Sequence, residues 1–102
     1  QMGTELDKAT QTQLNRGARL VEVLKQQQYS PLPVEEQVMA LYAATRGFMD
    51  DVPVGRVKEF EDRFLDYLRT SKPDILAGIR NLGTLSEPEI LNEAVQSFKK
   101  GF

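Results

Sequence analysis

Three pairs of acidic side chains are the groups in this sequence best suited to acid–base catalysis or metal binding. The pairs are Glu35 with Glu36, Asp50 with Asp51, and Glu87 with Glu89. The sequence has no Cys and no His, so the commonest general acid/base and the commonest transition-metal ligand are both missing. Each pair falls where we expect a helix to begin, and carboxylates there are stabilised by the positive end of the helix dipole. We therefore interpret these pairs as structural.

A second candidate site is the run of three glutamines at residues 26–28, which precedes the segment YSPLP. If this run leaves a helix in extended form, Gln26 and Gln28 point the same way, because extended side chains alternate. Two adjacent carboxamides supply donors and acceptors that can match the edge of a purine. Glutamines in a loop are more often only solvated, so the residues alone leave both interpretations open.

The helix that must organise the chain is predicted over residues 34–46. Its second half, VMALYAA at residues 38–44, is apolar on every side, and a helix that is apolar all round is buried. Pro33 suits the first turn, and Gly47 can supply the left-handed residue that ends the helix, with Phe48 folding back on Tyr42 or Ala43. We expect the other helices to pack around this one.

A helix is predicted before it, over about residues 8–25, with Asp7 as its N-cap. Its apolar positions fall within less than half of the helical circumference, and Gly17 among them suggests close approach by another helix. The positions expected to face the core are Leu14, Gly17, Ala18, Leu20, Val21 and Leu24.

Three more helices are predicted after the central one. The first covers about residues 53–70, with Val57, Phe60, Phe64, Tyr67 and Leu68 on its buried face. A capping box at residues 71–74 predicts a short helix that stops at Gly83. Ser86 as N-cap and a contact between Leu85 and Ile90 predict the last helix, which ends at Gly101. No segment alternates with period two for long enough to indicate a strand, so the predicted fold is all-α, a single bundle of about five helices.

Composition limits the possible functions. The chain of 102 residues suits one domain, and its net charge of −2 argues against a nucleic-acid partner. No apolar run reaches the roughly 20 residues that span a bilayer, so no direct membrane insertion is expected. Neither GxxxxGK[ST] nor GxGxxG occurs. Because the sequence starts with Gln1 rather than Met, we expect it to be a piece of a larger protein.

The segment RGARLVEVLKQQQYSPLPVEEQV at residues 16–38 resembles the C-terminal domain of the alpha subunit of the rotary F-type ATP synthase. The resemblance continues through LYAATRGFMDDVPV (41–54), FEDRFLDYLR (60–69) and SFKKGF (97–102). It implies that residues 1–102 form one helical domain that follows a β-barrel and a nucleotide-binding domain, both absent here. The phosphate-binding loop and the arginine that reaches the neighbouring catalytic site belong to the missing nucleotide-binding domain.

The resemblance further implies that this piece is not an enzyme by itself, although the parent complex is a proton-translocating ATP synthase. Gln26 and Gln28 match two glutamines beside the adenine of the non-catalytic site, where the intact subunit binds ATP or ADP with Mg; the fragment itself is expected to bind no cofactor. The implied partners are the beta subunit and the central-stalk gamma subunit. The stretch from Glu5 and Asp7 to about Leu14 matches an acidic helix-turn-helix that touches the rotor in the beta subunit. That contact is weaker in alpha, so the resemblance implies only a rotor-facing and subunit-facing edge here. The implied location is the cytoplasmic side of the bacterial inner membrane, peripheral to it.

Two further expectations follow. The sequence departs from the family pattern at Gln27, where proline or glycine is usual, and this loosens the expected glutamine loop. The family's domain begins with an additional helix before Gln1, so an apolar surface near the first helix should be exposed and should favour self-association. The alternative function from the residues alone is a free-standing helical adaptor that binds a peptide, and a magnesium-dependent hydrolase is a distant third.

Overall fold

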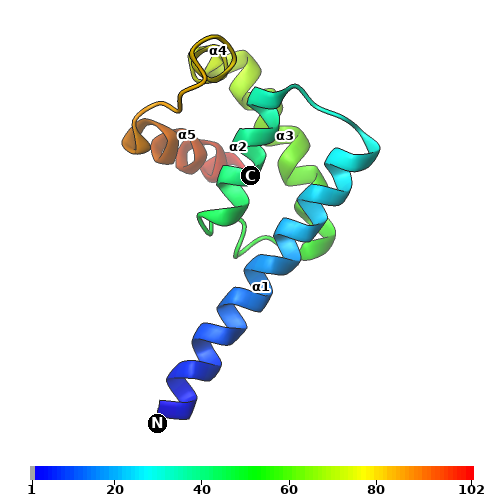
Figure 1. The fold of residues 1–102 in the computed structure, drawn as a ribbon, viewed down its shortest axis with the longest axis vertical. Helices are drawn as coiled ribbons and strands as arrows, with labels where there is room; N and C mark the ends of the chain where they lie inside the picture. Colours follow the sequence, from blue (N-terminus) through cyan, green and yellow to red (C-terminus); the bar gives the residue numbers. More distant parts are fainter. Residues whose placement is uncertain (1) are drawn as a thin grey trace.

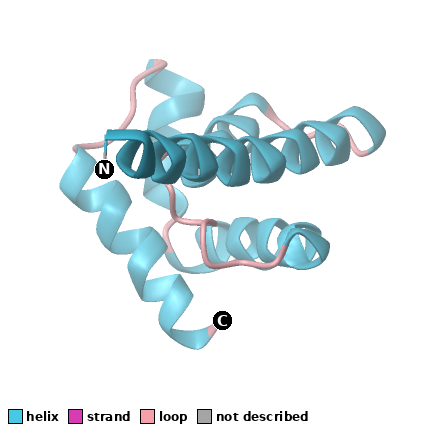
Figure 2. Cartoon of the chain, turned by 90° about the horizontal axis from the view of Figure 1, so that it is seen from below, coloured by secondary structure: helices cyan, strands magenta, loops and turns pink. Residues whose placement is uncertain are grey.

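The computed structural model describes the backbone of residues 2–102 and the side chains from Asp7 onward. The helices are α1 (Met2–Tyr29), α2 (Val34–Thr45), a 3-10 turn η1 (Val54–Arg56), α3 (Val57–Ser71), α4 (Pro73–Leu82) and α5 (Pro88–Gly101) (Figure 1). Over residues 2–102 the chain contains helices and loops and no strand (Figure 2). The predicted all-α bundle of five helices is confirmed.

Helix α2 packs against α1, α3 and α4, as predicted for the central element. The side chains of Met39, Ala40, Ala43 and Ala44 are completely buried, and Val38 packs partly buried against the same core. The short alanine side chains keep α2 thin, which lets its neighbours approach on several sides. The prediction that this apolar run forms the core is confirmed.

The end of α2 also has the predicted geometry. Gly47 has φ +85°, in the left-handed region that glycine adopts without a Cβ penalty. The N–H of Phe48 donates to the carbonyl of Ala43 at 3.0 Å, and the N–H of Gly47 donates to that of Ala44 at 3.4 Å. This pair of bonds is a Schellman motif, and it brings the ring of Phe48 to 6.3 Å from that of Tyr42. The motif turns the chain from α2 into the loop that leads to α3.

Helices α3 and α5 meet through aromatic side chains. Phe60 and Phe64 are completely buried on α3, and the ring of Phe98 on α5 lies 5.2 Å and 5.5 Å from theirs. The ring of Phe102 lies 5.2 Å from that of Phe60. Both contacts of Phe60 are edge-to-face, and such contacts stabilise the pair beyond the burial of apolar area. The predicted buried face of α3 is confirmed.

Helix α1 differs from its prediction in length and in the face it buries. It begins at Met2, so Asp7 lies inside the helix and is not its N-cap. Its N-terminal half projects from the bundle, whereas its C-terminal half packs on it (Figure 1). Leu14, Val21 and Leu24 are 63%, 51% and 48% exposed, while Val23 is completely buried. Of the predicted apolar arc, Leu20 packs against the core. Leu14, Val21 and Leu24 instead form the exposed apolar surface that was expected near this helix.

Gly17 does not mark a close helix contact, because a Cβ built on it would meet no atom within 4 Å. The predicted capping residues are also wrong: the N-caps of α4 and α5 are Lys72 and Glu87, and neither helix has a side-chain capping bond. Each helix instead begins with proline, whose fixed φ suits the first turn. Leu85 and Ile90, the expected hydrophobic staple, are each about half exposed. The predicted stop at Gly83, with φ +67°, is confirmed.

Candidate functional site

The glutamine run lies in the last turns of α1 and not in an extended loop. The N–H of Ser30 donates to the carbonyl of Gln26 at 2.8 Å, so the helical pattern passes through the whole run. Residues two apart on an α-helix are about 200° apart, so Gln26 and Gln28 point to opposite sides. The prediction that they point the same way is wrong, because the prolines at 31 and 33 end the helix only after Tyr29.

Each glutamine has a different environment. The side-chain amide of Gln26 donates to the Glu22 carboxylate at 3.1 Å, within α1. Gln28 is exposed. Gln27 faces the bundle, and its Nε2 is buried without a hydrogen-bond partner among the described residues. In this conformation the three carboxamides do not form one binding surface.

The acidic pair at the start of α2 ties that helix to two others. Glu36 forms a bidentate ion pair with Arg69 of α3, with Nε–Oε2 at 3.1 Å. Glu35 pairs with Arg80 of α4 at 3.4 Å. Both glutamates are more than nine-tenths buried, and hydrogen bonding to Glu36 raises the pKa of Arg69. Since each carboxylate is committed to a different arginine, this geometry supports the structural interpretation of the pair.

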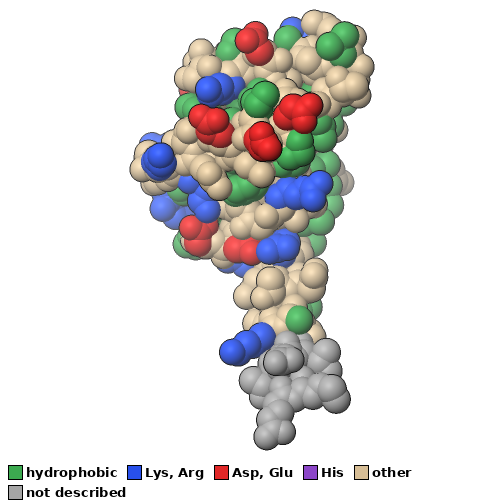
Figure 3. Space-filling model, turned by 90° about the vertical axis from the view of Figure 1, so that its left-hand side faces the viewer, with side chains coloured by type: hydrophobic (Ala, Val, Ile, Leu, Met, Phe, Trp, Pro, Cys, Tyr) green, Lys and Arg blue, Asp and Glu red, His purple; other side chains and the backbone are tan. Residues whose placement is uncertain are grey.

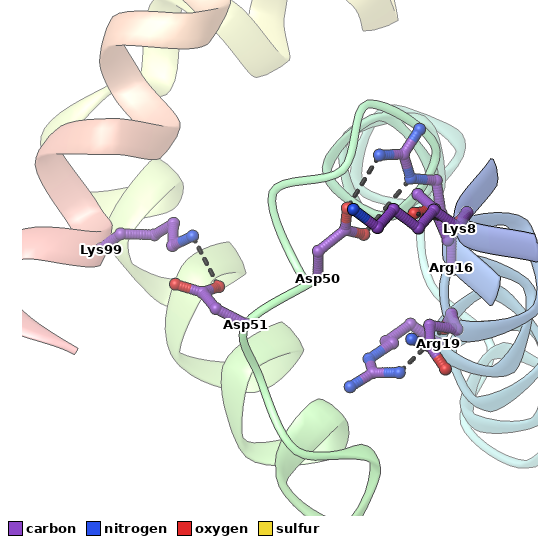
Figure 4. A network of polar contacts seen from close by, with 8 residues as sticks. Lys8, Arg16, Arg19, Asp50, Asp51 and Lys99 are labelled. Atoms are coloured by element: carbon purple, nitrogen blue, oxygen red, sulfur yellow. Dashed lines mark hydrogen bonds and ion pairs between the residues drawn. The ribbon is translucent and has the colours of Figure 1, made fainter. Parts of the chain in front are cut away.

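The second acidic pair anchors the loop after α2. Asp50 accepts two hydrogen bonds from Arg16 of α1, at 2.8 Å and 3.2 Å. Asp51 points the other way and pairs with Lys99 of α5 at 2.8 Å (Figure 4). That hydrogen bond lowers the pKa of Asp51. Arg19 adds a bond to the carbonyl of Val52 at 3.1 Å, so the loop joins α1 to α5 across the molecule.

Sequence reasoning did not single out Glu61, which is the most unusual ionisable group of the described residues. Its side chain on α3 is 2% exposed, and its Oε2 has no hydrogen-bond partner among the described residues. Burial raises its pKa from 4.5 to about 7. The sequence does indicate that Glu61 is buried, because it stands four residues after Val57 and four before Leu65. Helical spacing places these three residues on one face of α3.

A comparison with protein families matches residues 1–98 to the family described as ATP synthase alpha/beta chain, C terminal domain. The matched range includes α1 to α4 and most of α5. The chain belongs to this family. The match supports a place in an ATP synthase complex, which as a whole is an enzyme, and it applies equally to alpha and beta chains.

The segment of this ATP synthase domain that was expected to face the rotor is one uninterrupted helix. Residues 5–14 lie within α1, so the helix-turn-helix implied by the resemblance is not formed. Asp7 is exposed on the projecting half of α1, and the side chain of Glu5 lies outside the described residues. Between Asp7 and Phe102 no three acidic side chains cluster closely enough to hold a metal ion. No helix of the described chain is long and apolar enough to cross a membrane.

Proposed function

We propose that this domain belongs to an alpha subunit and that it is a non-catalytic structural and interaction module of the ATP synthase catalytic head. The observation that carries the assignment is the segment KQQQYSPLPVEEQV at residues 25–38, which is similar to the alpha chain. This segment joins α1 to α2, and its two glutamates hold α2 on α3 and α4. The motif thus coincides with the central connection of the bundle.

The proposed partners are the beta subunit and the central-stalk gamma subunit. Helix α1 supports this proposal because its outer face exposes Leu14, Val21 and Leu24, and its projecting half carries Asp7. Exposed apolar stripes with polar surroundings commonly mark protein contacts. In this proposal the complex synthesises ATP from a proton gradient and the domain lies peripheral to the bacterial inner membrane, on its cytoplasmic side.

We also propose that Gln26 and Gln28 contribute to the adenine side of a non-catalytic site that holds ATP or ADP with Mg in the intact subunit. The domain supplies only carboxamides, which can bond to a purine edge, while the groups that hold phosphate and Mg belong to the rest of the subunit. Because the two side chains diverge in the helical conformation, this role requires the last turn of α1 to open or only one glutamine to reach the base. The side chain of Gln28 is exposed, so it is free to reach the base.

A graft tests the alpha assignment. In one chimera residues 1–102 replace the C-terminal domain of a bacterial alpha subunit, and in a second chimera they replace that of the beta subunit. The alpha chimera should assemble with its partners and hydrolyse ATP, because the contact faces match, and the beta chimera should assemble poorly. Equal assembly of both chimeras, or assembly of the beta chimera alone, would contradict the proposal.

The glutamine role is tested in the alpha chimera with Gln26→Ala and Gln28→Ala. Loss of carboxamide bonds should reduce ATP retained at non-catalytic sites by about threefold to tenfold, a change of roughly 1 kcal/mol, while assembly is unchanged. Gln11→Ala is the matched control, since Gln11 is exposed far from this turn on α1. Retention unaffected by both substitutions would remove the glutamines from the site.

A further inference from the structure

A hollow of about 510 Å³ lies between the end of α2 and the start of α5, and we call it the α2–α5 hollow. Its apolar walls come from Phe48, Pro88 and Leu91, together with the ring of Tyr42. On the side of the molecule where α5 begins, hydrophobic side chains are exposed between charged ones (Figure 3). A concave and mainly apolar surface of this volume, with a few polar groups, is typical of a site for a small ligand.

Arg46 is the only charged residue that lines the α2–α5 hollow. Its guanidinium lies 5.5 Å from the centre of the Tyr42 ring. It forms no ion pair among the described residues. Glu89 and Glu93 of α5 do not line the hollow. The charge that an occupant meets inside the hollow is therefore positive.

Two uncharged polar side chains of the hollow also carry hydrogen-bond donors that are not used within the described chain. The Tyr42 hydroxyl donates to Asn92 Oδ1 at 2.6 Å, and this is the only side-chain hydrogen bond of Asn92 among the described residues. Its Nδ2 therefore keeps two N–H groups for an acceptor. Ser86 lines the hollow as well, and its hydroxyl makes no capping bond to α5. These donors, together with the guanidinium of Arg46, suit an anionic acceptor.

We propose that the α2–α5 hollow binds a small organic acid, in which one carboxylate is joined to an aromatic or aliphatic body. The carboxylate accepts hydrogen bonds from Arg46, whose planar guanidinium matches two carboxylate oxygens, and from Asn92 Nδ2. The hydrocarbon body packs on Phe48 and Leu91 and is removed from water there. Inorganic phosphate is disfavoured, because it gains nothing from the apolar walls and would be desolvated beside a single arginine.

The test titrates the chain with naphthylacetate and follows its backbone amide signals by NMR. Naphthylacetamide is the matched neutral ligand, because it keeps the ring system and loses the charge. The acid should bind about threefold to tenfold more tightly than the amide, and it should shift the signals of Tyr42, Arg46 and Leu91. Added salt should reduce the difference between the two ligands, since Arg46 is exposed.

Three variants separate the charge of the hollow from its shape. Arg46→Gln should weaken binding of naphthylacetate by about threefold to tenfold and leave binding of the amide within about twofold. Arg63→Gln is the matched control, since Arg63 is also exposed and lies 5.9 Å from the Phe102 ring, but does not line the hollow. It should leave both affinities within about twofold. Ser86→Trp fills the hollow, so it should weaken both ligands by at least about tenfold.

Several results would overturn the proposal. The acid and the amide bind equally, or Arg46→Gln and Arg63→Gln have the same effect on the acid. The shifted signals lie instead in the groove between α3 and α5 that Tyr67 and Phe98 line. A tripeptide that ends in Phe binds more than about tenfold more tightly than naphthylacetate, which would make the hollow a site for the end of a polypeptide.

Discussion

At the scale of single residues, Glu61 opposes the stability of the bundle at neutral pH. Its carboxyl group is buried on α3, where desolvation disfavours the charged form and raises the pKa to about 7. A carboxyl whose pKa is raised in the folded state binds its proton more tightly there than in the unfolded chain. The contribution of Glu61 therefore makes the free energy of unfolding highest at low pH. It lowers this free energy as the pH rises from about 4.5 to about 7.

Replacing Glu61 by Gln should remove this dependence. Gln keeps the shape of the side chain but has no charge to desolvate, so the variant should gain roughly 2 to 3 kcal/mol on the wild type between about pH 4.5 and pH 8. Urea unfolding at several pH values measures the difference, in which the contributions of other groups cancel. A difference that does not change with pH would show that Glu61 keeps an ordinary pKa in the folded state.

Gly17 is a second residue that lowers the stability of the fold in a way that can be measured. It lies inside α1, and a Cβ added there meets nothing within 4 Å. Gly17→Ala should therefore stabilise the domain by about 0.5 to 1 kcal/mol, because alanine loses less backbone entropy in a helix. Thermal unfolding followed by circular dichroism measures the change. A loss of stability would mean that another helix approaches this position more closely than the structure indicates.

Residue environments were predictable from the sequence only where a local rule determined them. The acidic pair at Glu35 and Glu36 was correctly assigned to a helix start, but its arginine partners come from α3 and α4, far along the chain. Gln26 and Gln28 were placed in the wrong conformation, because nothing before the prolines indicates where the helix stops. The orphaned Oε2 of Glu61 depends on neighbours that only the tertiary fold supplies.

At the scale of elements, the ion pairs of α2 should matter more than those on the surface. Arg69→Ala leaves the Glu36 carboxylate largely buried without its partner, and we expect a loss of about 1 to 3 kcal/mol. Lys58→Ala removes the exposed pair with Asp62, and we expect less than about 0.5 kcal/mol. Chemical denaturation of the two variants gives both values. Equal losses would mean that the Glu36 pair is solvated in the same way as a surface pair.

The elements themselves were predicted well in type and less well in their ends and faces. The Gly47 turn was predictable because glycine supplies a conformation that other residues avoid. The caps of α4 and α5 were not, because prolines fix the first turn without a side-chain bond. The buried face of α1 was predicted only in part. Leu20 packs against the core, whereas Leu14, Val21 and Leu24 lie on the side away from the bundle.

At the scale of the whole molecule, the exposed arc of α1 makes self-association of this chain an expected outcome. Light scattering at high protein concentration should show a species larger than the monomer, because association covers Leu14, Val21 and Leu24. Val21→Ser with Leu24→Ser should restore the monomer. Leu82→Ser is the matched control, since Leu82 is 76% exposed on α4. A wild-type chain that stays monomeric throughout would contradict the expectation.

The molecule as a whole is a bundle held by an apolar core, with its carboxylate–arginine pairs used to connect helices. The core gathers around α2, and the pairs of Asp50 and Asp51 join α1 and α5 to the same loop. These ion pairs fix the helices of this ATP synthase domain relative to one another. In our account the domain lends carboxamides to a nucleotide that other domains hold.

The most direct test of that account is calorimetry of residues 1–102 with Mg-ATP. Hydrogen bonds from one or two glutamines are each worth only about 1 kcal/mol, so the account predicts no binding tighter than roughly millimolar. Micromolar affinity for ATP would contradict it, because the domain would then hold the nucleotide by itself.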